Sequence, residues 1–185
     1  MDRLATVPEA RLEDSGSGLA PAEDGWFVVN VRDAEWATSK SFGSGCVFES
    51  EAAEFPQLGI NISVLEPGKP NCLYHSEAVQ EDFLVLSGRC KLLVDGEERD
   101  LGPWDFAHCP AGTEHVFVGA GDEPCVVVMV GARVPPEQLL YPVSELAARN
   151  GASAKEATPD PDQAYVGFEP SRRERLSYWD RLPWG

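Results

Sequence analysis

Two histidines and two glutamates in this sequence have the types and spacing of a metal site. His75 and Glu77 are two residues apart, Glu81 follows four residues later, and His115 comes after the turn residues Pro110–Gly112. Imidazole nitrogens and carboxylate oxygens bind divalent transition metals, and such groups are costly to bury together without a cation. If these side chains converge, they predict one divalent transition-metal ion.

The segments that must position these residues are short apolar runs separated by turn residues. Strand alternation would place His75 and Glu77 on one face, and a turn at 78–80 would let Glu81 enter the next strand beside them. Asp95-Gly96 is a favoured hairpin pair. The spacing of the runs predicts an antiparallel all-β sandwich or barrel. The runs are 26–31, 46–48, 60–65, 82–86, 90–94, 105–109, 115–119 and 125–130.

Two motifs in the chain resemble those of the cupin superfamily. The first family motif contains two paired histidines and then a glutamate, six residues and a glycine, and Glu81 and Gly88 match its end. The second motif is Pro-x-Gly-x-x-His, which Pro110, Gly112 and His115 match. The resemblance covers about residues 59–131. It implies a double-stranded β-helix (cupin) barrel that holds one divalent metal ion, Mn, Fe, Ni or Zn, inside.

The sequence departs from the family pattern at the paired histidine positions. Counting back from the motif glutamate puts His75 and Glu77 there, whereas counting forward from Gly68 would leave Tyr74 and Ser76. The first count supplies metal ligands and the second does not. We therefore adopt the first count.

Glu77 has two roles open to it. As a ligand it would complete a site of two histidines and two glutamates, whose carboxylates cancel the double charge of the ion. As a free side chain it would leave His75, Glu81 and His115 as a set with open coordination positions, and Glu77 could act as a general base. From the sequence we favour the ligand role.

Other residues are weaker candidates for the pocket wall. Tyr74, Gln80 and His108 could reach it, although His108 can also lie on the far face of its strand. Cys72 and Cys109 are expected to be small buried apolar residues, because no convincing basic neighbour is present to make a thiolate of either.

Composition excludes several classes of partner. The chain has 185 residues, with 15 Lys and Arg against 31 Asp and Glu, and a formal net charge of −16. This charge disfavours nucleic acid and anionic membrane surfaces as partners. No apolar stretch approaches the roughly 20 residues of a membrane-spanning helix. Five widely spaced cysteines without a Cys-x-x-Cys pair are expected to be free thiols in the cytoplasm.

We expect one barrel domain over residues 25–134 with an extension at each end. Residues 1–24 are acidic and lack an apolar period, which is typical of a disordered, mobile arm. Residues 135–185 should contain a short helix at 144–150, with a serine N-cap and a glycine stop, followed by a polar linker and an aromatic, arginine-rich tail.

The aromatic residues of the tail, Tyr178, Trp179 and Trp184, are expected to pack on the barrel or on a second subunit. We favour this packing over a role of the tail arginines in binding an anionic ligand. Edge strands of the barrel that need covering predict a homodimer.

Two functions from different classes are consistent with the sequence. The first is a small metal-dependent enzyme, and the resemblance implies oxygenase, isomerase or lyase chemistry on an oxygen-bearing small molecule. The second is a barrel that binds or senses a small ligand or a metal without turnover. A sugar-nucleotide or phosphosugar isomerase is less favoured, because Lys69, Arg89 and Lys91 are the few basic residues near the motifs.

Overall fold

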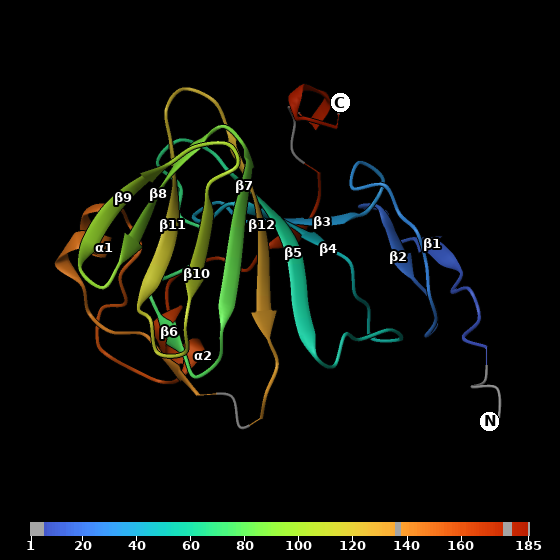
Figure 1. Ribbon diagram of the computed structural model, residues 1–185, viewed down its shortest axis with the longest axis horizontal. Coiled ribbons are helices and arrows are strands. Elements are labelled where there is room, and N and C mark those ends of the chain that lie inside the picture. Colours follow the sequence, from blue (N-terminus) through green and yellow to red (C-terminus); the bar gives the residue numbers. More distant parts are fainter. Residues whose placement is uncertain (1–5, 136–137, 176–178, 185) are drawn as a thin grey trace.

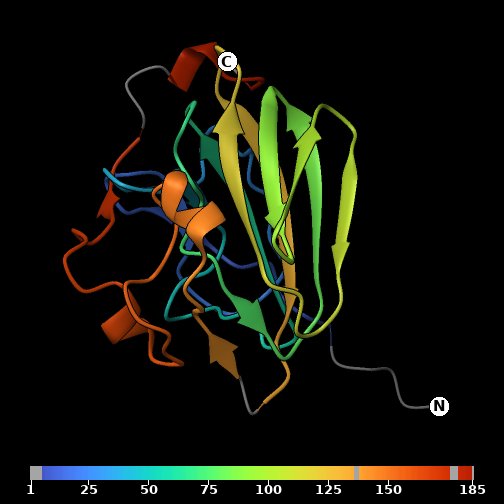
Figure 2. The same ribbon diagram turned by 90° about the vertical axis from the view of Figure 1, so that its left-hand side faces the viewer.

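Two facing antiparallel sheets form the barrel in the computed structural model of this protein, which describes residues 6–135, 138–175 and 179–184 (Figures 1 and 2). Within these residues the larger sheet has the strand order β10 (Phe106–Cys109), β7 (Glu81–Ser87), β12 (Cys125–Ala132), β5 (Leu58–Leu65), β4 (Ser44–Val47), β3 (Glu35–Thr38) and β14 (Arg172–Arg173). The smaller sheet has the order β11 (His115–Ala120), β8 (Arg89–Val94) and β9 (Glu97–Leu101). The predicted all-β barrel is confirmed.

Strand β12 is apolar along most of its length because both of its faces are buried. Val127 and Met129 belong to the core inside the barrel. Val126 points the other way and packs in a cluster with Trp36 and Trp179 on the outer face of the larger sheet. A strand covered on both faces is expected to be a continuous apolar run rather than an alternating one.

The turn at Asp95-Gly96 joins β8 to β9 as the sequence predicts. Both residues have positive φ, 45° and 79°, which is the backbone of a tight hairpin turn. The predicted strand at 26–31 is wrong. Asn30 ends that run, because its side chain accepts from the backbone N–H of Arg32 (2.9 Å) and its carbonyl accepts from that of Asp33 (2.8 Å).

The N-terminal region differs from the predicted mobile arm over residues 1–24. Residues 1–5 lie outside the described part of the chain, but β1 (Leu12–Asp14) and β2 (Leu19–Pro21) form a hairpin beside β3 (Figure 1). The hairpin is tied to the barrel by main-chain bonds such as Leu19 N to Asp33 O (2.7 Å). The hairpin pairs through main-chain hydrogen bonds, which do not require apolar residues at regular spacing. The sequence pattern therefore did not reveal the hairpin.

The C-terminal extension returns to the barrel. Strand β13 (Leu139–Leu140) pairs with β6 (Ser76–Glu77). Helix α1 (Glu145–Arg149) begins as predicted, because the Ser144 hydroxyl accepts from the backbone N–H of Ala147 (3.2 Å). A second short helix, α2 (Pro161–Ala164), lies where the sequence predicts only a linker.

The end of the chain packs on its own barrel. The 3₁₀ helix η1 (Trp179–Arg181) brings Trp179 edge-on against Trp36, with 4.5 Å between ring centroids, and Trp184 lies 5.4 Å from the same ring. The predicted packing of these two tryptophans is therefore confirmed, and it occurs within one chain. Tyr178 lies outside the described residues. In the described part of the chain, no helix is long and apolar enough to cross a membrane.

Candidate metal centre

His75 and His115 lie side by side because their main chains bond to each other. The backbone N–H of His115 donates to the carbonyl of His75 (2.8 Å), and the reverse bond measures 3.2 Å. Residues exchanged in this way on antiparallel segments point their side chains to the same side. The two imidazole centroids are 5.0 Å apart, and both rings are buried.

The carbonyls around the two rings fix which nitrogen faces the cavity. Nδ1 of His75 bonds to the Leu73 carbonyl (2.8 Å), and Nδ1 of His115 bonds to the Thr113 carbonyl (3.0 Å). A carbonyl only accepts, so both Nδ1 atoms carry hydrogen and the Nε2 lone pairs are free to bind a metal. Burial lowers the pKa of His75, and it lowers the pKa of His115 to about 4, so both rings are neutral at pH 7.

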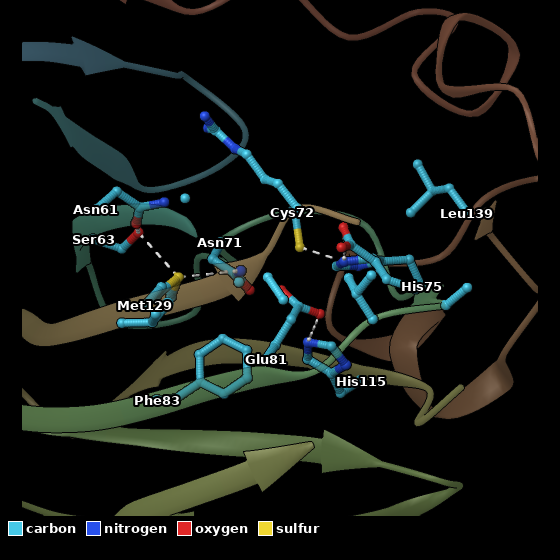
Figure 3. Close-up of a pocket in the computed structure, with 18 of the residues that line it drawn as sticks. Asn61, Ser63, Asn71, Cys72, His75, Glu81, Phe83, His115, Met129 and Leu139 are labelled. Atoms are coloured by element: carbon cyan, nitrogen blue, oxygen red, sulfur yellow. Dashed lines mark hydrogen bonds and ion pairs between the residues drawn. The ribbon is translucent and has the colours of Figure 1, made fainter. Parts of the chain in front are cut away.

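Glu81, the first residue of β7, completes a three-residue donor set. One donor atom each from His75, Glu81 and His115 lies within 4.8 Å of the others (Figure 3). Oε2 of Glu81 is 3.2 Å from Nε2 of His115. Burial raises the pKa of Glu81 to about 8, and the nearby charge of Glu77 adds to the rise. A carboxylate and an imidazole lone pair this close need a proton or a cation between them, so the donor set fits a divalent metal.

Glu77 lies beside this set rather than within it. Its Oε1 is 3.7 Å from Nε2 of His75, and its side chain is 34% exposed, compared with 16% for Glu81. The carbonyl of Glu77 accepts from the backbone N–H of Gly112 (2.7 Å), which ties β6 to the turn before His115. The carboxylate of Glu77 therefore sits at the cavity wall next to the candidate ligands.

A cavity of about 520 Å³ opens from the donor set, a volume within the range of small-molecule sites. Its wall combines polar and aromatic side chains from the barrel strands with tyrosines from the C-terminal extension. Besides the two glutamates and two histidines, the lining includes Asn61, Ser63, Asn71, Cys72, Phe83, Met129, Arg133, Gln138, Tyr141 and Tyr165.

Several of these residues escaped the sequence analysis. Asn61 and Ser63 occupy alternate positions of β5, and polar residues alternating within an apolar strand are a signal of a wetted barrel interior. Tyr141 and Tyr165 gave no such signal. The Tyr141 ring lies 5.8 Å from that of His75, and the Tyr165 hydroxyl accepts from the backbone N–H of Leu73 (3.1 Å).

The weaker sequence candidates lie away from the cavity. Tyr74 is in a core cluster beneath α1, and its hydroxyl accepts from the backbone N–H of Gly96 (3.3 Å). Gln80 and His108 both bond to the Asp82 carboxylate, at 2.5 and 2.6 Å. Asp82 follows Glu81 on the same strand, so alternation turns this group to the outer face.

The two cysteines near the motifs differ in position. Cys109 is buried in the barrel core, whereas Cys72 lines the cavity with its Sγ 3.5 Å from Nδ1 of His75. Burial raises the pKa of both thiols, so they stay protonated. All five cysteines of the chain are free, as predicted.

A comparison with known families agrees with this geometry. The family model for the cupin domain matches residues 61–131, a range that contains His75, Glu81 and His115. The chain carries a cupin domain. The larger sheet of this cupin extends beyond the matched range through β4, β3 and β14.

Solved structures similar to this cupin include a sugar phosphate isomerase of the cupin superfamily from Silicibacter pomeroyi. It is 27% identical, with a TM-score of 0.52 over 60% of this chain and 79% of that one. The polyketide cyclase RemF from Streptomyces resistomycificus is 14% identical, with a TM-score of 0.50 over 85% and 94% of the two chains. A candidate sugar phosphate isomerase from Acidithiobacillus ferrooxidans is 28% identical over 45% of this chain, with a TM-score of 0.43, and the match spans 55% of that protein. No curated protein matches the sequence.

Proposed function

We propose that this cupin is a metal-dependent enzyme that acts on an oxygen-bearing small molecule. The observation that carries the proposal is the donor set of His75, Glu81 and His115 at the wall of a cavity of about 520 Å³. These three residues would hold one divalent ion, Mn, Fe, Ni or Zn. Three protein ligands beside a cavity leave coordination positions for a substrate.

When bound, the metal would polarise a carbonyl or hydroxyl oxygen of the substrate. The remaining work falls to side chains of the chain itself. Phe83 packs edge-on against the His115 ring, with centroids 5.2 Å apart, and Tyr141 packs against His75. These rings hold the imidazoles in place and keep water from that side of the site.

Glu77 is the group that we propose as the general base. Its carboxylate is at the cavity wall, outside the three-residue donor set and more exposed than Glu81. From this position, a carboxylate oxygen of Glu77 would take a proton from the carbon next to a substrate carbonyl and return it to a neighbouring atom. Such a transfer is isomerase chemistry, and the 27% identical isomerase supports this class over the oxygenase and lyase alternatives.

Metal analysis and isotope exchange would test the function. Protein purified without chelator or histidine tag should contain about one transition-metal ion per chain. In D₂O, the metal-loaded protein should exchange a carbon-bound hydrogen of hydroxyketones such as dihydroxyacetone or fructose, as followed by NMR. Metal without exchange of either probe would favour the alternative, a barrel that binds or senses a small molecule without turnover.

We also propose that the protein is a cytoplasmic homodimer. Five free cysteines support a reducing compartment. Exposed apolar side chains such as Trp26, Val28, Trp104 and Phe106 support a second subunit that covers part of the barrel. A monomer mass by light scattering at micromolar concentration would contradict the dimer.

A further inference from the structure

A second chamber adjoins the cavity at the metal centre. It has a volume of about 420 Å³ and lies along strands β5 and β4. The two cavities share lining residues, so they lie next to each other at a mostly polar junction. In Figure 3, Asn61 and Ser63 lie at one end of the drawn pocket, and His75 and His115 lie at the other. The shared residues are Gly59, Asn61, Ser63, Asn71, Arg133 and Tyr165.

The strand register explains why the second chamber is open. Gly45 of β4 pairs with Ser63 of β5 and with Ala37 of β3, and Val47 pairs with Asn61. Residues directly opposite on antiparallel strands point to the same face, so this face carries small or short side chains. A Cβ atom built on Gly45 would meet nothing within 4 Å, which shows that the chamber lies over this glycine.

Asn71 presents hydrogen-bond donors at the junction. Its Oδ1 accepts from the backbone N–H of Phe117 (2.8 Å), and this bond fixes the orientation of the side-chain amide. Its Nδ2 therefore points the other way, where its protein acceptor is the thioether sulfur of Met129 at 3.8 Å. The Ser63 hydroxyl lies near two acceptors, this sulfur (3.3 Å) and the Oδ1 atom of Asn61 (3.4 Å). A thioether is a weak acceptor, and the contact from Ser63 to Asn61 is long for a hydrogen bond between oxygens. A carbonyl or hydroxyl oxygen of a ligand would therefore be a better acceptor for both donors.

The charge of the second chamber is balanced. Arg133 is the cation among the described residues that line the two cavities, and both of its terminal nitrogens bond to the Glu49 carboxylate, at 2.7 and 2.8 Å. Arg133 also donates to the Phe55 carbonyl (2.7 Å). A phosphate group would bring about two negative charges into a chamber whose cation is already neutralised.

We propose that the substrate is a neutral molecule carrying hydroxyl and carbonyl groups, with a metal-binding head beside His75 and His115 and a tail that reaches over Gly45. This inference rests on the proposed metal-dependent function and specifies the substrate class of the same site. The molecule is recognised at the junction by the amide of Asn71 and the hydroxyl of Ser63. Phosphate esters are disfavoured, which separates this protein from an enzyme that acts on sugar phosphates.

Matched probes test the substrate class. Binding to the metal-loaded protein would be measured by calorimetry for fructose, for fructose 6-phosphate and for lactulose, a neutral ketose with a second sugar ring. Fructose should bind more tightly than its phosphate ester, and lactulose should bind at least as tightly as fructose because its second ring enters the chamber. Tighter binding of the ester, or no saturable binding of lactulose, would overturn the proposal.

The substitution Gly45→Val tests the second chamber directly, because Gly45 lines the chamber and a Cβ at this position meets no atom within 4 Å. Lactulose affinity should fall by about tenfold or more, as crowding of a well-packed site does, while fructose affinity stays within about twofold. Gly102→Val is the matched control, since a Cβ at Gly102 also meets nothing within 4 Å and Gly102 lies outside both cavities. An unchanged lactulose affinity in Gly45→Val would overturn the proposal that the substrate enters the second chamber.

Metal content separates this proposal from the function on which it rests. Each protein sample would be analysed for metal before the binding measurement. Protein that cannot retain a metal ion would contradict the proposed function itself. Protein that holds one ion per chain but fails the probe or Gly45→Val measurements would contradict the substrate class alone.

Discussion

Oε2 of Glu81 lies 3.2 Å from Nε2 of His115, and both atoms are hydrogen-bond acceptors in the ordinary ionisation states of their side chains at pH 7. The Nδ1 hydrogen of His115 is already committed to the Thr113 carbonyl. The pair is therefore stable only with a shared positive charge, either a proton on Glu81 or a metal ion. The fit of the candidate site to a metal ion and its expected response to pH both follow from this relationship.

Replacing His115 by alanine should leave a folded barrel with little metal. The change removes one of three ligands and the partner of Glu81, so affinity for a divalent ion should fall by at least about 100-fold. Metal per chain, measured by elemental analysis after dialysis, is the readout. His108→Ala is the matched control, because His108 bonds to Asp82 on the outer face and should not affect metal content. Full metal retention in His115→Ala would contradict the assignment.

Glu77→Gln should decide the role of Glu77. If Glu77 is a general base, as proposed, the amide cannot accept a substrate proton, and hydrogen exchange in D₂O should be lost while metal affinity stays close to that of the wild type. A large loss of metal affinity in Glu77→Gln would instead support the ligand role that the sequence favours. Metal titration and exchange are measured on the same preparation.

A second substitution at the same position probes the departure from the family pattern. Glu77→His restores a histidine at the second paired position. Because Glu77 lies outside the proposed donor set, the metal preference should stay unchanged, whereas a metal ligand at residue 77 would shift it toward softer ions such as Cu or Zn. Competition between Mn and Zn for the metal-free protein would measure any shift. An unchanged preference would indicate that the side chain at residue 77 does not reach the ion.

The motifs predicted that His75, Glu81 and His115 come together, as they do in the candidate metal centre, because strand periodicity and two turns suffice to place them. His75 and Glu81 are separated by one short strand and a turn, and the backbone pairing of His75 with His115 closes the set. The turn before His115 has the glycine that its backbone demands, as the φ of +86° at Gly112 shows. Local rules of this kind can be recognised in a single sequence.

The remaining cavity wall depends on contacts between distant segments. Tyr141 and Tyr165 reach the site because β13 pairs with β6 and the chain then returns across the barrel, and no local pattern encodes that path. Tyr74, which was a weaker candidate for the pocket wall, is a different case, because a local rule explains its position. Neighbouring residues on an extended segment point in opposite directions, so Tyr74 entered the core instead.

Trp179→Ala should destabilise the protein by about 3 to 5 kcal/mol, as expected for truncating a buried tryptophan. Trp179 is 8% exposed, contacts Trp36 edge-on, and donates through its indole nitrogen to the Arg32 carbonyl (3.2 Å). The free energy of unfolding in urea would measure the loss. Val166→Ala is the control, because Val166 is 65% exposed and its truncation should change stability by less than about 0.5 kcal/mol.

This prediction also concerns the subunit interface. Since Trp179 covers its own barrel, the mass by light scattering should be the same in Trp179→Ala as in the wild type. A change of mass without a loss of stability would show that the tail serves a second subunit instead.

The metal-free protein should lose stability as the pH rises from about 6.5 to 8. Burial raises the pKa of Glu81 from 4.5 to about 8, so between these values the folded chain holds a proton that the unfolded chain has released, and stability falls with rising pH. The pKa of His115 is lowered from 6.5 to about 4, and its opposite contribution is complete above pH 6.5. Over the remaining 1.5 pH units, the ionisation of Glu81 lowers the free energy of unfolding by roughly 2 kcal/mol.

Thermal unfolding of EDTA-treated protein at a series of pH values measures this loss, and Glu81→Gln is the control because an amide has no proton to release. The melting temperature of the wild type should decrease as the pH rises from 6.5 to 8, whereas the melting temperature of Glu81→Gln should change little. Added metal binds the ionised carboxylate, so the stabilisation by metal should increase over the same interval. A melting temperature of the metal-free wild type that rises with pH would show that the buried Glu81 proton does not control the stability of the site. An equal decrease in the melting temperature of Glu81→Gln would show the same.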